Sequence, residues 1–293
     1  MNISLLPTTS CLNADGIFDL QNALLLCGQI GGICYSPSGY ENLKREEKSV
    51  TSRRVDLTLR LGHHSIFDHV QISLEISGIP KILAMILNNE KQYTTSEKSA
   101  RYTHFVVSKD SPTSEIEVLL YEKWIPLFEE MILEQYPGIE EKKRKKLALE
   151  NARYFISVFA PTNMVYTVPL GQLNRIAGWL TDYSSKNKDP FSKRLNPTIR
   201  DFVNNLKALN LIESRLQTNE KARNLSLFAS EEKSLHFYES FDFTYSVKYL
   251  GSFAQLAQAH RHRTISYQMV IPEDFYAFVP PILTKYPEKR ASW

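Results

Sequence analysis

The side chains best suited to chemistry stand near the C-terminal end, in a Gln-x-x-Arg-His-Arg segment from Gln258 to Arg263. Two guanidinium groups and an imidazole beside a glutamine indicate an anionic ligand, because the planar fork of arginine donors matches a phosphate or an anionic ring. A second polar set lies far upstream and comprises Glu97, Ser99, Arg101 and Tyr102. Together the two sets predict an anion-binding site that draws on distant parts of the chain.

A third set is the segment Gly62–His69, which contains three histidines. His63, His64 and His69 lack the i, i+4 spacing of a helical zinc pair, and no cysteine or Glu-x-x-His motif lies nearby. The pattern therefore does not predict a metal site. We expect Phe67 and His69 to pack under the sheet.

Apolar periodicity predicts the elements that position these groups. Strict alternation over Val70–Ile76 predicts a strand, which the following glycine and proline end. The polar stretch Ser184–Asn196, which contains Pro190, is predicted to be a connecting loop. A glycine-rich stretch is expected to end the first helix. The predicted helices cover residues 19–26, a short stretch after residue 80, and residues 118–135, 140–151, 170–182 and 197–211.

The chain also resembles itself. Residues 72–96 and 244–268 each run as an alternating strand, a glycine break, a helix and a polar loop. This comparison places Asn89 opposite Arg261, an offset of 172 residues (261 − 89). The first copy thus has Asn89, Glu90 and Lys91 where the second has Arg261, His262 and Arg263. We predict two units, residues 1–225 and a partial, truncated second repeat over residues 226–293.

The bulk composition narrows the class of protein. The chain has 293 residues, of which 43% are hydrophobic, and a net charge of only +3, which gives no support for a general polyanion binder. Three cysteines without metal-ligand spacing are expected to be reduced thiols. Neither a membrane-spanning run nor a signal peptide is evident, so we expect a cytoplasmic protein and no membrane partner.

The motifs resemble those of the flavin-dependent thymidylate synthases, the ThyX or thymidylate synthase complementing protein family. The segment from Arg261 to Ser266 matches the RHRxxS signature, and Gly62–His69 resembles the family's Gly-His motif. Glu97–Tyr102 matches Glu-x-Ser-x-Arg-Tyr, and Asn151–Thr167 resembles a third family segment. The chain departs where Ser184 and a second serine replace a later arginine. The resemblance implies an α/β fold of the α+β kind, with a mixed, largely antiparallel sheet flanked by helices.

In function, the resemblance implies an enzyme that methylates dUMP to dTMP, with FAD as cofactor and NADPH and methylenetetrahydrofolate as co-substrates. Catalytic roles fall on Arg261 and Gln258, and His63 is expected on the folate side. The residues implied to bind the flavin are Ser65, Asp68, Asn174, Arg261, His262 and Arg263. The residues implied to bind dUMP are Glu97, Ser99, Arg101, Arg153, Gln258 and Arg261.

Each copy keeps the motif half that the other has lost, which predicts a site shared between repeats or between chains of a homo-oligomer. Two alternatives remain open at this stage. One is a non-catalytic homologue that binds flavin or nucleotide. The other is an RNA-binding module that uses the basic run at residues 140–146 and the Arg-His-Arg segment, although no aromatic stacking pattern accompanies that segment.

Overall fold

The computed structural model describes residues 1–37, 39–98, 115–217, 225–228, 245, 247–260, 265, 267–270 and 278–293. Its centre is an antiparallel sheet of four strands in the order β1-β2-β4-β3. The strands are β1 (Asn2–Leu5), β2 (Gln71–Pro80), β3 (Thr94–Glu97) and β4 (Pro161–Pro169). The predicted fold class, a largely antiparallel sheet flanked by helices, is confirmed.

The strand β2 confirms the alternating pattern and extends beyond it to Pro80. Ile72, Leu74 and Ile76 are fully buried, so one set of alternate side chains forms the core of the sheet. The register with β4 shifts next to Gly78, whose φ of +72° favours glycine. The strand is irregular at this glycine but continues to Pro80, so the prediction that the glycine ends the strand is wrong.

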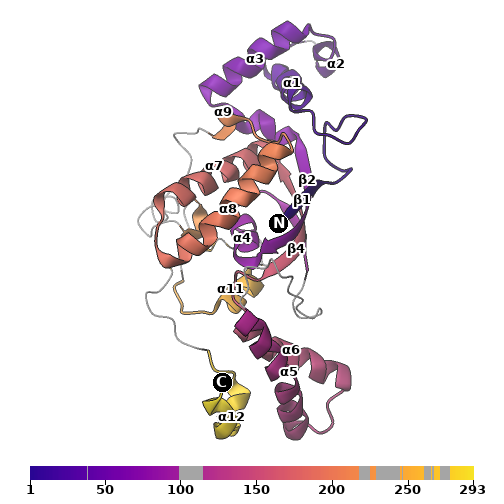
Figure 1. The fold of residues 1–293 in the computed structure, drawn as a ribbon. Coiled ribbons are helices and arrows are strands. Elements are labelled where there is room, and N and C mark those ends of the chain that lie inside the picture. Colours follow the sequence, from indigo (N-terminus) through magenta and orange to yellow (C-terminus); the bar gives the residue numbers. More distant parts are fainter. Residues whose placement is uncertain are drawn as a thin grey trace.

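Helices surround the sheet, and α4, α7 and α8 lie beside it in Figure 1. The α-helices are α1 (Leu20–Gly31), α2 (Tyr40–Leu43), α3 (Lys48–Leu61), α4 (Lys81–Leu87), α5 (Glu115–Gln135), α6 (Glu141–Ala152), α7 (Leu170–Lys186), α8 (Pro190–Ala208), α9 (Ser214–Gln217), α11 (Phe253–Ala259) and α12 (Pro287–Ala291). Short 3-10 turns are η1 (Gly32–Cys34), η2 (His64–His69), η3 (Arg153–Phe155), η4 (Ser226–Phe228) and η5 (Pro281–Lys285). Among the described residues, no helix is long and apolar enough to cross a membrane.

A second hydrophobic cluster joins α5 and α6 to the C-terminal residues. Trp293 packs edge-on against Trp124, with ring centroids 4.9 Å apart, and its indole nitrogen donates to the Phe278 carbonyl oxygen at 2.9 Å. Leu283 of η5 is fully buried in the same cluster. A segment about 130 residues later in the chain therefore packs against the helix pair α5 and α6 and completes its hydrophobic cluster. The basic run at residues 140–146 forms the start of α6, as predicted.

Two sequence predictions about element boundaries are wrong. The stretch Ser184–Asn196 is not a loop, because α7 continues to Lys186 and α8 begins at Pro190. Pro190 occupies the first helical position, where its missing N–H costs nothing, and Asp189 caps the helix by accepting from the Ser192 N–H at 3.0 Å. The boundary predicted at residue 26 is also wrong, because α1 continues past Gly28 and ends at Gly31, within the glycine-rich stretch that was predicted to end it. Gly28 instead allows α1 to approach α3, since a Cβ there would lie 2.5 Å from Val55.

The second motif copy departs from its predicted strand. Residue 245 and residues 247–250 are described as irregular chain, and the helix that follows them, α11, is present. In the first copy, β2 is stabilised by ladders to both β1 and β4. Among the described residues, no strand pairs with residues 247–250, and an unpaired strand leaves its backbone groups without partners.

Candidate functional site

Several predicted site residues lie outside the described residues: Ser99, Arg101, Tyr102, Arg261, His262, Arg263 and Ser266. The structure describes the residues on either side of the Arg-His-Arg segment, namely His260, Ile265 and Tyr267. It also describes the remaining predicted residues. The site can therefore be built from its edges.

The helix α11 carries Gln258 and leads directly into the Arg-His-Arg segment. It is the counterpart of α4: both helices have seven residues, and both their first and last residues are 172 positions apart (253 − 81 and 259 − 87). Gln258 is half-buried on α11. Phe253, at the start of α11, stacks against Phe191 of α8 with ring planes 4° apart, which holds α11 against α8.

The structure brings the two motif copies together at a place that we call the copy junction, formed by Asn89, Lys91, Ser226, Ile265 and Tyr267. The Asn89 amide nitrogen donates to the Tyr267 carbonyl oxygen at 2.9 Å, and its oxygen accepts from the Tyr267 N–H at 3.3 Å. Lys91 Nζ donates to the Ile265 carbonyl oxygen at 3.0 Å. The altered residues of the first copy thus contact the chain immediately after the signature of the second.

Two carboxylates of the first copy have partners within the chain. Glu90 is fully buried and accepts hydrogen bonds from the Ser226 N–H at 2.5 Å and from the Ser226 hydroxyl at 2.8 Å. Glu97, predicted to bind substrate, accepts from Lys81 Nζ at 2.5 Å across the start of α4. Sequence reasoning missed Lys81, because 16 residues separate it from Glu97 and only the packing of the chain brings the two together.

His260, the C-cap residue of α11, lies against Tyr267 of the copy junction. Only 7% of this residue is exposed, neither ring nitrogen has a hydrogen-bond partner, and the ring lies edge-on to Tyr267 at 4.8 Å. Burial first, and then the charges of Lys81 and Lys91, lower the pKa of His260 to about 4. A neutral imidazole therefore stands next to the signature at neutral pH.

Asp68, a predicted flavin contact, forms an ion pair with Arg175 of α7, whose Nη2 donates to both carboxylate oxygens, at 3.1 and 3.0 Å. It also accepts from the Gln172 N–H at 3.1 Å, which places a carboxylate at the positive N-terminal end of α7. The Gln172 side chain donates to the Lys91 carbonyl oxygen at 2.9 Å, so a chain of hydrogen bonds connects Asp68 to the copy junction. Arg175 was missed, because helical periodicity alone does not show which carboxylate a half-buried arginine meets.

The histidine segment is arranged differently from expectation. Phe67 is fully buried, as predicted, but His69 is exposed, and the prediction that it packs under the sheet is wrong. His64 takes the inner position, with Nε2 3.1 Å from the Leu59 carbonyl oxygen, because η2 directs its first residue, His64, inward and leaves its last, His69, exposed. Ser65 and His63 are exposed at this edge.

Arg153 and Asn174 occupy contrasting surroundings. The Nε of Arg153 is buried and has no hydrogen-bond partner, so this arginine at the start of η3 retains a donor for a ligand. Asn174 is fully buried, where it donates to the Leu170 and Leu211 carbonyl oxygens and accepts from the Glu213 N–H. The described contacts of Asn174 hold α7 to the segment after α8.

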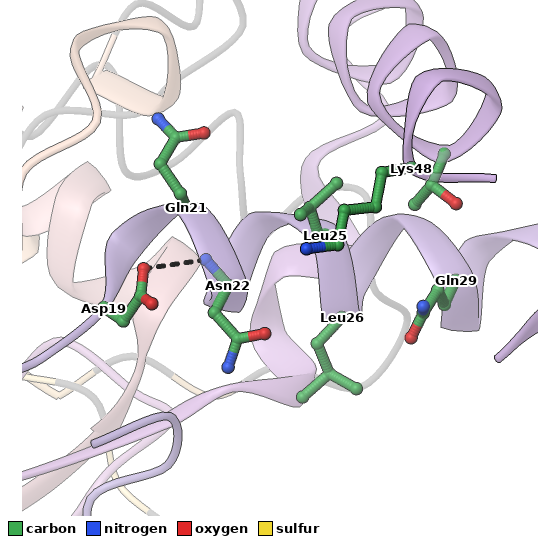
Figure 2. A pocket seen from close by; sticks show the side chains of 8 residues that line it. Asp19, Gln21, Asn22, Leu25, Leu26, Gln29 and Lys48 are labelled. Carbon is green, nitrogen blue, oxygen red and sulfur yellow. Dashed lines mark hydrogen bonds between the residues drawn. The ribbon is translucent and has the colours of Figure 1, made fainter. Parts of the chain in front are cut away.

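A surface pocket of about 260 Å³ lies apart from these residues, along α1 and the start of α3 (Figure 2). Its acidic residue, Asp19, already caps α1 by accepting from the Asn22 N–H at 3.0 Å. Burial raises the pKa of the Cys27 thiol to about 12, so this cysteine offers no thiolate near neutral pH. The pocket is lined by Asp19, Gln21, Asn22, Leu25, Leu26, Gln29, Lys48 and Thr51.

Comparisons with known proteins agree on one family. The family model described as Thymidylate synthase complementing protein matches residues 17–186. A flavin-dependent thymidylate synthase of Clostridium tetani (strain Massachusetts / E88) is 23% identical over 153 residues, which cover 46% of this chain. The matched region spans 61% of the length of that relative.

Two solved structures align with the chain at low similarity. A UMP/dUMP methylase from Streptomyces cacaoi, solved with 5-Br dUMP, aligns with a TM-score of 0.45 and 11% identity over 74% of this chain and 93% of its own. A flavin-dependent thymidylate synthase from Helicobacter pylori, complexed with FAD and dUMP, aligns with a TM-score of 0.40 and 17% identity over 67% of this chain and 92% of its own.

Proposed function

The chain belongs to the thymidylate synthase complementing protein family, and from this premise we propose that it is a flavin-dependent thymidylate synthase. It converts dUMP to dTMP, takes the methylene group from methylenetetrahydrofolate and uses FAD, which NADPH reduces. The observation that carries the proposal is that the family match contains the predicted residues Asp68, Arg153 and Asn174.

The donors of the chain fit anionic ligands. Arg153 has a buried Nε without a partner, and a charge-assisted hydrogen bond to phosphate would satisfy it. Arg101 and Ser99 supply further phosphate donors in the proposal, while Arg261, His262 and Arg263 hold the flavin with Ser65. Bound FAD, once reduced by NADPH, would supply the hydride that turns the transferred methylene into a methyl group.

The residues of the chain contribute orientation and charge. Gln258 and Arg261 hold the uracil ring, and the fixed positive charge of Arg261 stabilises negative charge that develops on its carbonyl oxygen. His260 adds no positive charge near neutral pH, because its pKa is about 4. His63, exposed at the edge of η2, faces the folate in this proposal.

The site is composite in this proposal. Residues 1–225 form one repeat and residues 226–293 belong to a second, and each contributes the motif half that the other lacks. The equal lengths and constant offset of α4 and α11 support the repeat, and the contacts of Asn89 with Tyr267 support the meeting of the copies. Homo-oligomers would complete any site that one chain leaves open.

Turnover tests the proposal directly. The purified chain is incubated with dUMP, FAD, NADPH and methylenetetrahydrofolate, and dTMP is measured by mass spectrometry. We expect dTMP, and we expect Gln258→Ala to abolish it while retaining the fold. A parent protein that binds both FAD and dUMP and yields no dTMP would contradict catalysis.

That negative result would support a second candidate, a non-catalytic homologue that binds flavin or nucleotide. The specific observation in its favour is the state of the first copy, where Glu97 is paired with Lys81 and Glu90 with Ser226. Flavin absorbance of the purified protein is expected under both candidates. Its absence after incubation with FAD would contradict both.

A further inference from the structure

We propose that Asn89, Glu90 and Lys91 have exchanged a ligand-binding role for a positioning role: they clamp the segment that carries the signature of the second copy. This inference rests on the proposed function, since it concerns the same site. By the constant offset, the three residues stand where the second copy has Arg261, His262 and Arg263. None of the three is a catalytic residue in this account.

The first contact of the clamp is the Asn89 amide. It both donates to the Tyr267 carbonyl oxygen and accepts from the Tyr267 N–H, so it pairs with that backbone much as a neighbouring strand would. Asn89 is only 5% exposed, and its Nδ2 also donates to the Ser226 hydroxyl at 2.8 Å. An arginine at this position could not accept the Tyr267 hydrogen bond, because guanidinium has no acceptor.

Tyr267 passes this restraint on to α11. Its hydroxyl donates to the Ala259 carbonyl oxygen at 2.9 Å, and its ring packs against His260. The residues before and after the Arg-His-Arg segment are therefore joined to each other through Tyr267 and to the first copy through Asn89. Anchored ends reduce the conformational entropy that the segment loses on binding a ligand.

Glu90 and Lys91 extend the clamp on either side of Asn89. Glu90 accepts from both the N–H and the hydroxyl of Ser226 in η4, and the next residue of η4 accepts from the Met269 N–H at 2.7 Å. Lys91 Nζ reaches the Ile265 carbonyl oxygen. The Lys91 carbonyl oxygen accepts from Gln172, which links the clamp to α7.

Amide hydrogen exchange on the full chain tests these contacts without any ligand. In Asn89→Ala, we expect the Tyr267 amide to exchange about tenfold faster while β2 amides keep their rates, because only a local opening is made easier. The matched control is Asn205→Ala, which removes an asparagine that bonds only to Asp201 within α8. It should leave Tyr267 unchanged, and an unchanged Tyr267 amide in Asn89→Ala overturns the clamp.

Titration with FAD then separates positioning from mere stability. We expect Asn89→Ala to raise the Kd for FAD about tenfold with unaltered β2 exchange, and Lys91→Met, which changes an exposed contact, to raise it about twofold to fivefold. Faster Tyr267 exchange with an unchanged Kd would overturn the positioning role. If Asn89→Ala does not fold, Lys91→Met decides: a Kd equal to that of the parent overturns the proposal.

Failure of the proposed function has a different signature. A parent protein that takes up no FAD contradicts the flavin-dependent synthase, whereas the exchange rates at Tyr267 still decide whether the clamp exists. Asn89→Arg sharpens the result, because it restores the family residue and removes the acceptor. We expect it to speed Tyr267 exchange as much as Asn89→Ala does.

Discussion

The helices α4 and α11 follow equivalent stretches of sequence and have equal lengths, yet their surroundings differ. Every residue from Ile82 to Leu87 of α4 is buried, and no residue of α11 is. At the offset of 172, Gln258 of α11 corresponds to Ile86 of α4, which is fully buried in the core. The helix α4 is a core element, while α11 keeps polar side chains at partly exposed positions.

The difference in burial also explains why Asn89, Glu90 and Lys91, which follow α4, bond to other parts of the chain. These residues follow a buried helix, so their polar groups need partners inside the protein. Asn89 and Glu90 find them in Tyr267 and Ser226. Arg261 and Arg263 follow α11, which has no buried residue, and in the proposed function they serve a ligand.

The largest expected effect concerns the two helices themselves. Leu83→Ala in α4 should lower the free energy of unfolding by about 2–5 kcal/mol, because it leaves a cavity in a packed core. Leu256→Ala in α11, which removes a partly buried side chain, should cost roughly 1 kcal/mol or less. Urea denaturation of both variants measures the difference. Equal losses would show that the helices are equally part of the core.

A pH effect is expected at His260, the last residue before the signature. The pKa of His260 is lowered from 6.5 to about 4 in the folded protein. Between these two pH values the unfolded chain therefore binds a proton at His260 that the folded protein does not. Stability should therefore fall as the pH drops from about 6.5 towards 4, by up to about 1.4 kcal/mol per pH unit. His260→Phe should flatten this slope.

A nuclear magnetic resonance titration sharpens the same point. Lys91→Met removes one of the two charges that lower the pKa of His260, so that pKa should rise in the variant. Lys289→Met, which changes a lysine paired with Glu130 in the α5 region, is the control and should not move it. A His260 pKa that is identical in the parent and in Lys91→Met would place Lys91 away from the junction.

A smaller effect is expected at the ion pair between Asp68 and Arg175, which leads into the junction. Both side chains are partly exposed, so Arg175→Met should cost roughly 1–2 kcal/mol of unfolding free energy. The exposed pair of Lys186 with Asp182 is the matched control, and Lys186→Met should cost about 0.5 kcal/mol or less. Thermal unfolding of the two variants would contradict this ranking if Lys186→Met were the more damaging.

The smallest effect on stability is expected at Gln258. Gln258→Ile gives α11 the residue of α4, and stability should change by no more than about 0.5 kcal/mol because the position is only half-buried. In the proposed function, binding of dUMP should nevertheless be lost. Calorimetric titration with dUMP checks this, and unaltered binding would remove Gln258 from the site.

Much of this arrangement could be predicted from the sequence where one strong physical signal governed it. The strand β2 followed from apolar alternation, and the burial of Phe67 was expected of an aromatic side chain next to the predicted strand. The start of α8 at Pro190 could not be predicted, because a proline favours a loop and a first helical position alike. The hydrogen bond from the Ser192 N–H to Asp189 decides for the helix. The strand of the second copy failed for a related reason, since pairing partners are a property of the whole fold.

The candidate site was predictable in part. The sequence identified Asp68, Glu97 and Gln258 as polar residues of interest, but not their partners Arg175 and Lys81. Nor did it suggest that Asn89 meets Tyr267, a contact across 178 residues. Such pairings depend on how distant segments pack, which local propensity and spacing do not specify.

The most direct measurement is a pair of FAD titrations, on Arg263→Ala and on Lys91→Ala. Charge-assisted hydrogen bonds contribute about 1.5–3 kcal/mol, so Arg263→Ala should raise the Kd for FAD roughly tenfold to more than a hundredfold. Lys91→Ala, which loosens the clamp only at its edge, should raise it about fivefold or less. If Arg263→Ala binds FAD as well as the parent and Lys91→Ala loses it, the roles assigned to the two copies are reversed and the account is contradicted.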